Sequence, residues 1–390
     1  MLDPLPPPPP WAVSLVKPFS EALHLPSLPY HIHEVVGAFL LYQTTQSIIS
    51  PVLSNFLFPN IYPKLTRRTR VNWDVHVVSL LQSCVINTAA LWVIFKDQER
   101  KDMQRSPIER IYAYTGASGL IQGLATGYFV WDLVVSARYI KIFGPGILAH
   151  AITALSVFAL GFRPFCNYYG PVFILYELST PFLNIHWFCD KLNMTGSQLQ
   201  WYNGMILLSV FFGCRLIWGT YQSLRVYQDV WHTMHLNIQT GSVLREIPTS
   251  PHSSIFVPRD GQLCLGDKSC IVAQTEVMQF TGPHSKAVPF WLAGVYLTCN
   301  LVLNSLNFYW FGKMIEAVLK RFEGKPHEEF PRERERQRKQ SIVEAAATEL
   351  DYETLSGPKS LDEESDEMGE PTDLGKSTAL SDGAAEARKR

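Results

Sequence analysis

The chain has 390 residues, of which 47% are hydrophobic and only 18% are charged, and its formal net charge is −1 at pH 7. Soluble domains carry about 25% charged residues and rarely build one core of this size, so the composition argues against a single soluble domain. The near-zero net charge gives no indication of a nucleic-acid partner.

The N-terminal segment, residues 1–32, is Pro-rich, and its run Pro6 to Pro10 predicts an extended spacer. Seven apolar segments follow, each about 17–27 residues long, which is the length range of membrane-spanning helices. They are His33–Phe58, Val71–Phe95, Tyr112–Ala137, Gly146–Phe162, Tyr168–Phe188, Leu199–Tyr221 and Val288–Met314. The sequence therefore predicts an all-α membrane protein, a bundle of about seven transmembrane helices spanning residues 33–315.

Two polar stretches interrupt or follow this domain. Residues 227–287 contain several prolines and glycines, which predict an irregular loop. Cys264 and Cys270 lie in that loop and could form a disulfide if it is lumenal, a question that the sequence leaves open. From residue 316 to 390 a basic run is followed by an acidic run with few aromatics, which predicts a disordered, charged cytosolic tail able to recruit protein partners.

Basic residues beside the predicted spans indicate their orientation, because cytosolic flanks carry an excess of Lys and Arg. The first linker holds Lys64, Arg67, Arg68 and Arg70, and the C-terminal flank begins with Lys313, Lys320 and Arg321. This distribution predicts a lumenal N-terminus and a cytosolic C-terminus. The linker from Lys96 to Arg110 disagrees, because its five basic residues would then be lumenal.

The fifth segment, Tyr168–Phe188, contains the most unusual polar set. Its Glu177, Pro181 and Asn184 are spaced i, i+4, i+7, so in an α-helix they would share one face. A carboxylic acid and a proline in the middle of a span persist only where neighbouring helices satisfy them. This face is therefore predicted to look into protein and not into lipid.

Further polar residues inside the predicted spans mark the candidate site, because ionisable groups in a membrane are costly and often functional. The candidates are Asp132, His150, Glu177, Asn184, His76, Asn203, Arg215 and Asn304. The predicted orientation places Asp132, His150, Asn184, His76 and Asn203 in the cytosolic half, which suggests a cavity open to the cytosol.

Each candidate also has a structural interpretation. Glu177 and Arg215 lie deeper than the others and are interpreted as a buried pair. Asn304 belongs to a stripe with Asn300 and Asn307, an arrangement that commonly joins helices. A histidine such as His150 can also simply hydrogen-bond a neighbouring helix, so its role stays open at this point.

Four strings together resemble the TLC-domain family of multi-pass membrane proteins: NWDVHVVSLLQS, GYFVWDLVVS, ELSTPFLNIHWF and NLVLNSLNFYWFGKM. The resemblance covers roughly residues 33–315 and is strongest to the subgroup named TLC domain-containing proteins. It implies a helix bundle of the endoplasmic reticulum that handles lipids. In the related ceramide synthases, a histidine pair and Asp residues are associated with acyl transfer from acyl-CoA to a sphingoid base.

The chain departs from that pattern at the histidines. The family's adjacent pair stands here as His150-Ala151, and its second-span histidine as Gln82, whereas Asp132 matches. The leading hypothesis is therefore a lipid-homeostasis protein that binds a membrane lipid or acyl chain in the bundle, with Glu177 and Asn184 among the binding residues listed above.

Two alternatives remain beside lipid binding. One is an N-acyltransferase with fatty acyl-CoA as co-substrate, in which His150 is the general base and Asp132 orients it. The other is a cargo or scaffold protein that acts through its tail. Neither a metal site nor any cofactor is expected.

Overall fold

The computed structural model describes residues 1, 3–235 and 288–322 of the chain. The predictions for most of the polar loop, for the Cys264–Cys270 pair and for the charged tail lie outside the described residues. The chain divides into two units, Met1–Leu355 and Ser356–Arg390. All described residues belong to the first unit.

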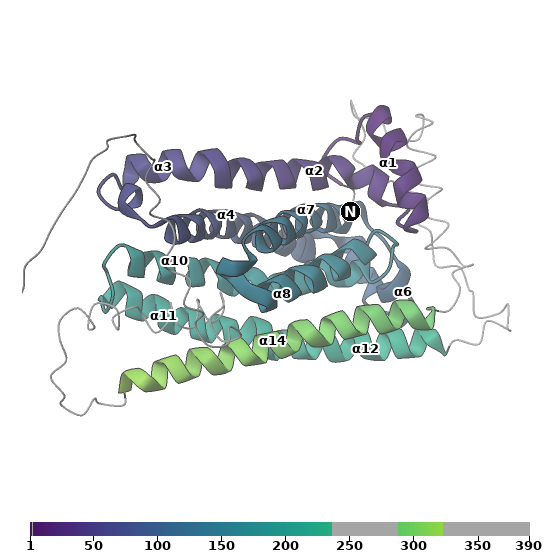
Figure 1. Cartoon of the computed structure of the whole chain (residues 1–390). Helices are drawn as coiled ribbons and strands as arrows, with labels where there is room; N and C mark the ends of the chain where they lie inside the picture. Colours follow the sequence, from purple (N-terminus) through teal and green to yellow (C-terminus); the bar gives the residue numbers. More distant parts are fainter. Residues whose placement is uncertain (2, 236–287, 323–390) are drawn as a thin grey trace, which may run out of the picture. The chain divides into compact units, whose positions relative to one another are not determined.

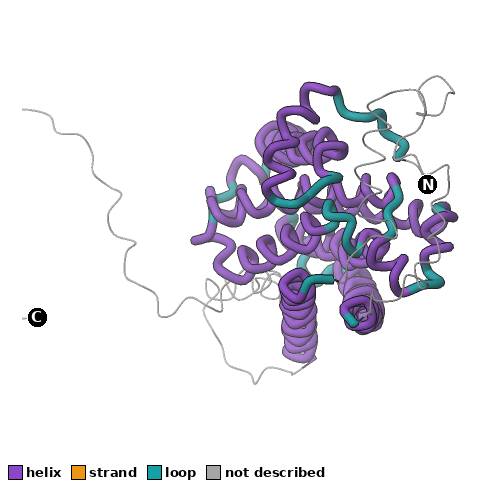
Figure 2. Tube along the Cα trace, turned by 90° about the vertical axis from the view of Figure 1, so that its right-hand side faces the viewer, coloured by secondary structure: helices purple, strands orange, loops and turns teal. Residues whose placement is uncertain are grey.

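Within the described ranges the chain folds into helices joined by short loops, and the elements include no strand (Figure 1). The helices are α1 (Pro10–Ala22), α2 (Leu28–Thr44), η1 (Thr45–Ile49), α3 (Ser50–Leu57), η2 (Tyr62–Lys64), α4 (Arg67–Lys96), α5 (Gln98–Met103), α6 (Pro107–Tyr112), α7 (Gly116–Arg138), α8 (Ile140–Leu160), η3 (Asn167–Tyr169), α9 (Gly170–Phe173), η4 (Ile174–Ser179), α10 (Thr180–Lys191), α11 (Gln198–Phe211), η5 (Phe212–Trp218), α12 (Gly219–Met234) and α14 (Phe290–Phe322). Helices α2, α12 and α14 run in the same general direction across Figure 1, and the view from the side in Figure 2 shows some helices end-on and others crossing them.

Four stretches of helix among the described residues are long and apolar enough to cross a membrane: Arg67–Lys96, Gly116–Arg138, Ile140–Leu160 and the continuous Gln198–Met234. They coincide with the second, third, fourth and sixth predicted segments. The protein is therefore a multi-pass membrane protein. The remaining predicted segments are also helical, in α2 to α3, in η3 to α10 and in α14.

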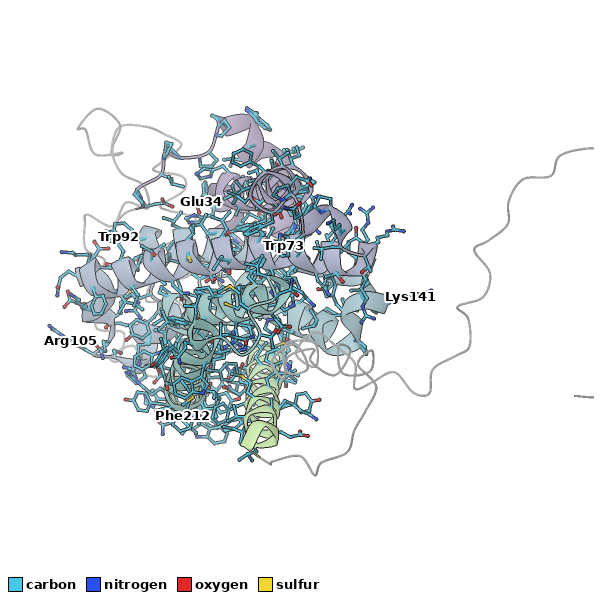
Figure 3. The ribbon with its side chains drawn as sticks, turned by 90° about the vertical axis from the view of Figure 1, so that its left-hand side faces the viewer. Glu34, Trp73, Trp92, Arg105, Lys141 and Phe212 are labelled. Carbon is cyan, nitrogen blue, oxygen red and sulfur yellow. The ribbon has the colours of Figure 1, made fainter. Side chains whose placement is uncertain are left out.

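The distribution of side chains is inverted relative to a soluble protein. Large apolar side chains such as Phe56, Phe95 and Phe290 are exposed, and Trp92 and Phe212 project from the outer surface in Figure 3. Many polar side chains of α4, α7 and α10 are instead buried. An apolar exterior around a polar-containing interior is what lipid as a solvent requires.

Helices α2 and α7 approach each other closely along a row of glycines that the sequence analysis did not single out. Gly119, Gly123 and Gly127 are spaced four residues apart on α7 and face α2. A Cβ atom added at Gly127 would lie 2.7 Å from the Cβ of Ala38 and 3.2 Å from the backbone nitrogen of Phe39. Small residues at this spacing allow two membrane helices to pack backbone to backbone.

The fifth predicted segment is not one α-helix. A 3₁₀ stretch, Ile174–Ser179, connects α9 to α10, and the second half begins with Thr180 and Pro181. The expectation that Glu177, Pro181 and Asn184 share one α-helical face was therefore wrong for Glu177, which lies in the tighter 3₁₀ turn. Proline cannot supply a backbone N–H, so the preceding carbonyls must find other donors.

Candidate functional site

A cavity of about 140 Å³ lies in the bundle among α4, α7, α8, η4, α10, α11, η5 and α14. Six of the eight predicted site residues line it: His76, Asp132, His150, Glu177, Asn184 and Arg215. They come from segments far apart in the sequence. The rest of the wall is largely apolar and includes Tyr128, Phe143, Ile147, Leu183, Phe211 and Trp310.

A second cavity of about 40 Å³ adjoins the first through shared residues. His150, Glu177 and Arg215 line both cavities. The walls of the smaller cavity are otherwise mainly apolar and include Phe158 and Leu303. These three polar side chains therefore stand between two apolar-walled spaces.

The predicted pair of Arg215 and Glu177 is confirmed, although the two groups touch only loosely. Arg215 Nη2 lies 3.7 Å from Glu177 Oε1. Neutral oxygens bind the guanidinium more closely: Nε donates to the carbonyl of Tyr176 at 2.9 Å, and Nη1 donates to Asn307 Oδ1 at 3.0 Å. Nη2 also donates to the Thr180 hydroxyl at 3.2 Å. Arg215 is thus a fixed charge that joins η5, η4, α10 and α14.

His150 faces the cavity from the middle of α8. Its ring lies 5.5 Å from the Trp310 ring and 6.5 Å from the Phe129 ring, measured between centroids. Its Nδ1 atom is buried and has no hydrogen-bond partner among the described residues. Asp132 lines the same cavity and accepts a hydrogen bond from Ser136 at 3.3 Å. Aromatic packing therefore orients the His150 ring, and no carboxylate bonds its Nδ1.

His76 and Asn184 form a second polar pair on the cavity wall. His76 Nδ1 lies 2.7 Å from Asn184 Oδ1, and the His76 ring stacks on Trp187 at 4.1 Å between centroids. The Asn184 amide nitrogen donates to the hydroxyl of Ser79 and to the carbonyl of Thr180. The pair is fixed on both sides, so it presents a defined polar surface where α4 meets α10.

The other two candidates, Asn203 and Asn304, do not line either cavity. Asn203 donates to the carbonyl of Phe182 at 2.7 Å. Asn304 donates to Ser223 at 2.8 Å and accepts from the Tyr176 hydroxyl at 3.2 Å. Both asparagines join neighbouring helices, and for Asn304 this agrees with the structural interpretation of the asparagine stripe.

Among the cavity residues that the sequence analysis missed are Tyr128, Ser179 and Trp310. Trp310 follows Asn307 by three residues, so the position of the asparagine stripe could have indicated it. Gln82, which stands where the related family carries a histidine, lines neither cavity. Its side-chain amide is buried without a hydrogen-bond partner among the described residues.

An ion pair joins α6 to α12 near the C-terminal end of α12. Arg110 of α6 donates two hydrogen bonds of 2.6 Å to the Asp229 carboxylate of α12. Hydrogen bonding to that carboxylate raises the pKa of the Arg110 guanidinium above its ordinary value. The Tyr169 hydroxyl donates to the same carboxylate.

A multi-pass helical bundle with a polar-lined central cavity is the class of protein that these observations define. Residues 72–316 match the family model for the TLC domain. The chain belongs to the TLC-domain family.

Several relatives share this domain. An uncharacterized TLC domain-containing protein of Schizosaccharomyces pombe is 35% identical over 309 residues, covering 79% of this chain and 86% of the relative. Topoisomerase I damage affected protein 4 of Saccharomyces cerevisiae is 32% identical over 232 residues, 56% of this chain and 80% of the relative. Human TLC domain-containing protein 4 is 25% identical over 158 residues, which cover 40% of this chain and 58% of the relative. No solved structure matches this chain.

Proposed function

We propose that this protein binds a single membrane lipid or acyl chain in the central cavity and acts in lipid homeostasis. The observation that carries the proposal is the composition of the cavity wall. Six charged, histidine or amide side chains from distant segments converge with four serine and threonine hydroxyls on a space whose remaining walls are aromatic and aliphatic. Binding sites for small amphiphiles have this composition, because apolar walls take the chain and a few polar groups fix the headgroup.

Arg215 and His76 would hold the polar end of such a ligand. The guanidinium is fixed by its neutral partners, so its charge remains directed at the cavity region without depending on Glu177. A fixed charge with little reorganisation favours an anionic or strongly polar headgroup. Phe143 and Ile147 would contact the chain.

Lipid analysis of the purified full-length protein tests this proposal. Ile147→Trp would fill the cavity from α8, and Ile152→Trp places the same residue on the exposed face of the same helix. We expect the lipid that co-purifies with the wild type, measured by mass spectrometry, to be lost in Ile147→Trp and retained in Ile152→Trp. Equal lipid content in both folded variants would refute binding in this cavity.

A second candidate, the acyl-CoA-dependent N-acyltransferase, is favoured by one observation. His150 and Asp132 line the same cavity, so a base and a carboxylate could meet one substrate. A base must take the amine proton as the acyl group leaves its thioester, which contributes about 10²–10⁴-fold to the rate. In this reaction His150 would take the proton, while Asp132 would have to act on the substrate or through a rearranged His150 ring.

An acyl-transfer assay separates the two candidates. Membranes containing the protein receive labelled long-chain acyl-CoA and a sphingoid base, with His150→Ala and Asp132→Asn as variants. An N-acyl product that disappears in both variants would support the enzyme. Product formation by the wild type that survives in His150→Ala would rule out the assigned base.

The same proposal includes the membrane arrangement. It comprises seven spans in the endoplasmic reticulum, with the C-terminus and the mouth of the cavity on the cytosolic side. The resemblance to ceramide synthases supports the compartment, and the basic flanks at Lys64 to Arg70 support the orientation. Labelling of single cysteines placed at Lys64 and Arg105 from outside sealed microsomes tests it. Labelling at Lys64 alone is expected, and labelling at Arg105 alone would reverse the orientation.

A further inference from the structure

A cluster of metal-ligating side chains lies away from the central cavity, where the N-terminal segment meets α2 and α7. Asp3, His31 and Glu34 each present a ligand atom, and these atoms all lie within 4.8 Å of one another. Asp3 and His31 are completely buried, and Glu34 is 3% exposed. Figure 3 labels Glu34 on the side of the bundle formed by α2.

The cluster contains buried oxygens that its own hydrogen bonds do not satisfy. His31 Nδ1 lies 2.8 Å from Glu34 Oε2 and 3.4 Å from Asp3 Oδ2. Glu34 Oε1 and Asp3 Oδ2 have no hydrogen-bond partner among the described residues. These two oxygens are costly to bury without a donor or a cation.

A further imidazole borders the cluster. His33 Nε2 lies 3.7 Å from Glu34 Oε1, and neither ring nitrogen of His33 has a hydrogen-bond partner in the described part of the chain. Two ligands bound at about 2.0–2.2 Å in tetrahedral geometry lie roughly 3.3–3.5 Å apart. The 3.4 Å between His31 Nδ1 and Asp3 Oδ2 is close to that value, whereas the 2.8 Å between His31 Nδ1 and Glu34 Oε2 is a hydrogen bond that a bound ion would replace.

The surroundings hold the cluster in the way that metal sites are held. The Tyr114 hydroxyl forms a hydrogen bond with His31 Nε2, the ring nitrogen that points away from the carboxylates. Such a partner orients the His31 ring so that its Nδ1 atom faces the two carboxyl groups. Gly119 and Gly123 make room on α7, because a Cβ at Gly119 would lie 2.7 Å from His31 Cε1 and one at Gly123 would lie 3.0 Å from the Cβ of Glu34.

We propose that Asp3, His31 and Glu34 bind a divalent transition-metal ion of the zinc class. An imidazole nitrogen beside two carboxylates suits Zn²⁺, whereas an all-oxygen set would favour Mg²⁺ or Ca²⁺. The ion ties the N-terminal segment to α2 at a position distinct from the lipid cavity. The proposal does not depend on the proposed lipid function.

Metal analysis of the full-length protein tests the site. The protein is purified in detergent without chelator and its metal content per chain is measured by elemental mass spectrometry. Chelator-treated protein is then titrated with Zn²⁺, with Mg²⁺ as a control ion, while the melting temperature is followed. Co²⁺ supplies a visible absorption spectrum that reports tetrahedral coordination by the protein.

Asp3→Asn and Glu34→Gln keep the shape of the cluster and remove one charge each. Asp74→Asn is the matched control, because Asp74 is a buried carboxylate bonded to Ser50 and Tyr62 elsewhere in the bundle. We expect about one zinc per chain and a rise in melting temperature with Zn²⁺ in the wild type and in Asp74→Asn. Each cluster variant should bind Zn²⁺ at least about 10-fold more weakly, because even mutation of a residue that only hydrogen-bonds to a metal ligand lowers metal affinity by that factor.

Two results would overturn the proposal. One is a wild type that contains no metal and whose melting temperature does not respond to Zn²⁺ after chelation, which would identify the cluster as a network of hydrogen bonds and an ion pair alone. The other is a zinc affinity of Asp3→Asn and Glu34→Gln that equals the affinity of the control Asp74→Asn, which would place the ion elsewhere.

Discussion

The close approach of α2 and α7 makes Gly127 the most informative position for a stability test. A methyl group there would meet backbone atoms of α2, namely the Val35 carbonyl oxygen and the Phe39 nitrogen, as well as the Ala38 side chain. These atoms cannot rotate away, so the helices must separate. Overpacking of this kind costs typically 1–3 kcal/mol.

The same substitution has a favourable component, because alanine is better than glycine in a helix by about 1 kcal/mol. At Gly37 of α2 that component acts alone, since an added Cβ would have no neighbour within 4 Å. Gly127→Ala is therefore expected to lower the free energy of unfolding by about 0–2 kcal/mol net. Gly37→Ala should keep it unchanged or raise it.

Thermal unfolding of the two detergent-purified variants, followed by the monomer fraction that survives heating, measures this difference. The order of melting temperatures should be Gly37→Ala, then wild type, then Gly127→Ala. If Gly127→Ala melts as high as Gly37→Ala, the close packing of α2 on α7 described here is incorrect.

Three further predictions concern charge, hydrogen bonding and access. Arg110→Ala should destabilise the protein by about 3–5 kcal/mol in a thermal melt, because it leaves the Asp229 carboxylate buried without its cationic partner. The control Arg105→Ala should change the stability little, because the Arg105 side chain is 82% exposed, and equal losses in the two variants would contradict this prediction. Arg215→Lys keeps the positive charge but cannot replace the hydrogen bonds that the three guanidinium nitrogens donate. The same assay should show a loss of about 1–3 kcal/mol in the free energy of unfolding, and an unchanged melting temperature would refute the role of these hydrogen bonds. Burial raises the pKa of the Cys166 thiol, so a variant retaining only that cysteine should react with maleimide after unfolding and not before.

The central cavity could largely be predicted from the sequence, because the cost of a polar group in a span depends on that residue alone. Asp132 and His150 needed no knowledge of their neighbours to be placed inside the bundle. The same rule failed to separate Asn203 and Asn304 from the cavity residues. Whether an asparagine joins two helices or faces a cavity depends on the residue that the neighbouring helix places opposite it. The sequence around the asparagine does not reveal that residue.

Two other features were missed for different reasons. The glycines at 119, 123 and 127 were visible as a regular spacing in the sequence and could have predicted the α2–α7 contact. The cluster of Asp3, His31 and Glu34 could not be predicted in this way. Asp3 and His31 are 28 positions apart in the numbering and belong to a Pro-rich stretch whose path to α2 has no periodic signal.

The 3₁₀ stretch of the fifth segment has a consequence for how the chain enters the membrane. The carbonyl of Glu177 receives its side-chain hydrogen bond from Asn87, 90 residues earlier, and that of Tyr176 from Arg215, 39 residues later. The Glu177 carbonyl also accepts from the backbone N–H of Thr180, so the two side chains add bonds from outside the segment to those that it makes itself. We therefore expect the fifth segment to be less stable in the bilayer alone than beside α4 and the helix that carries Arg215.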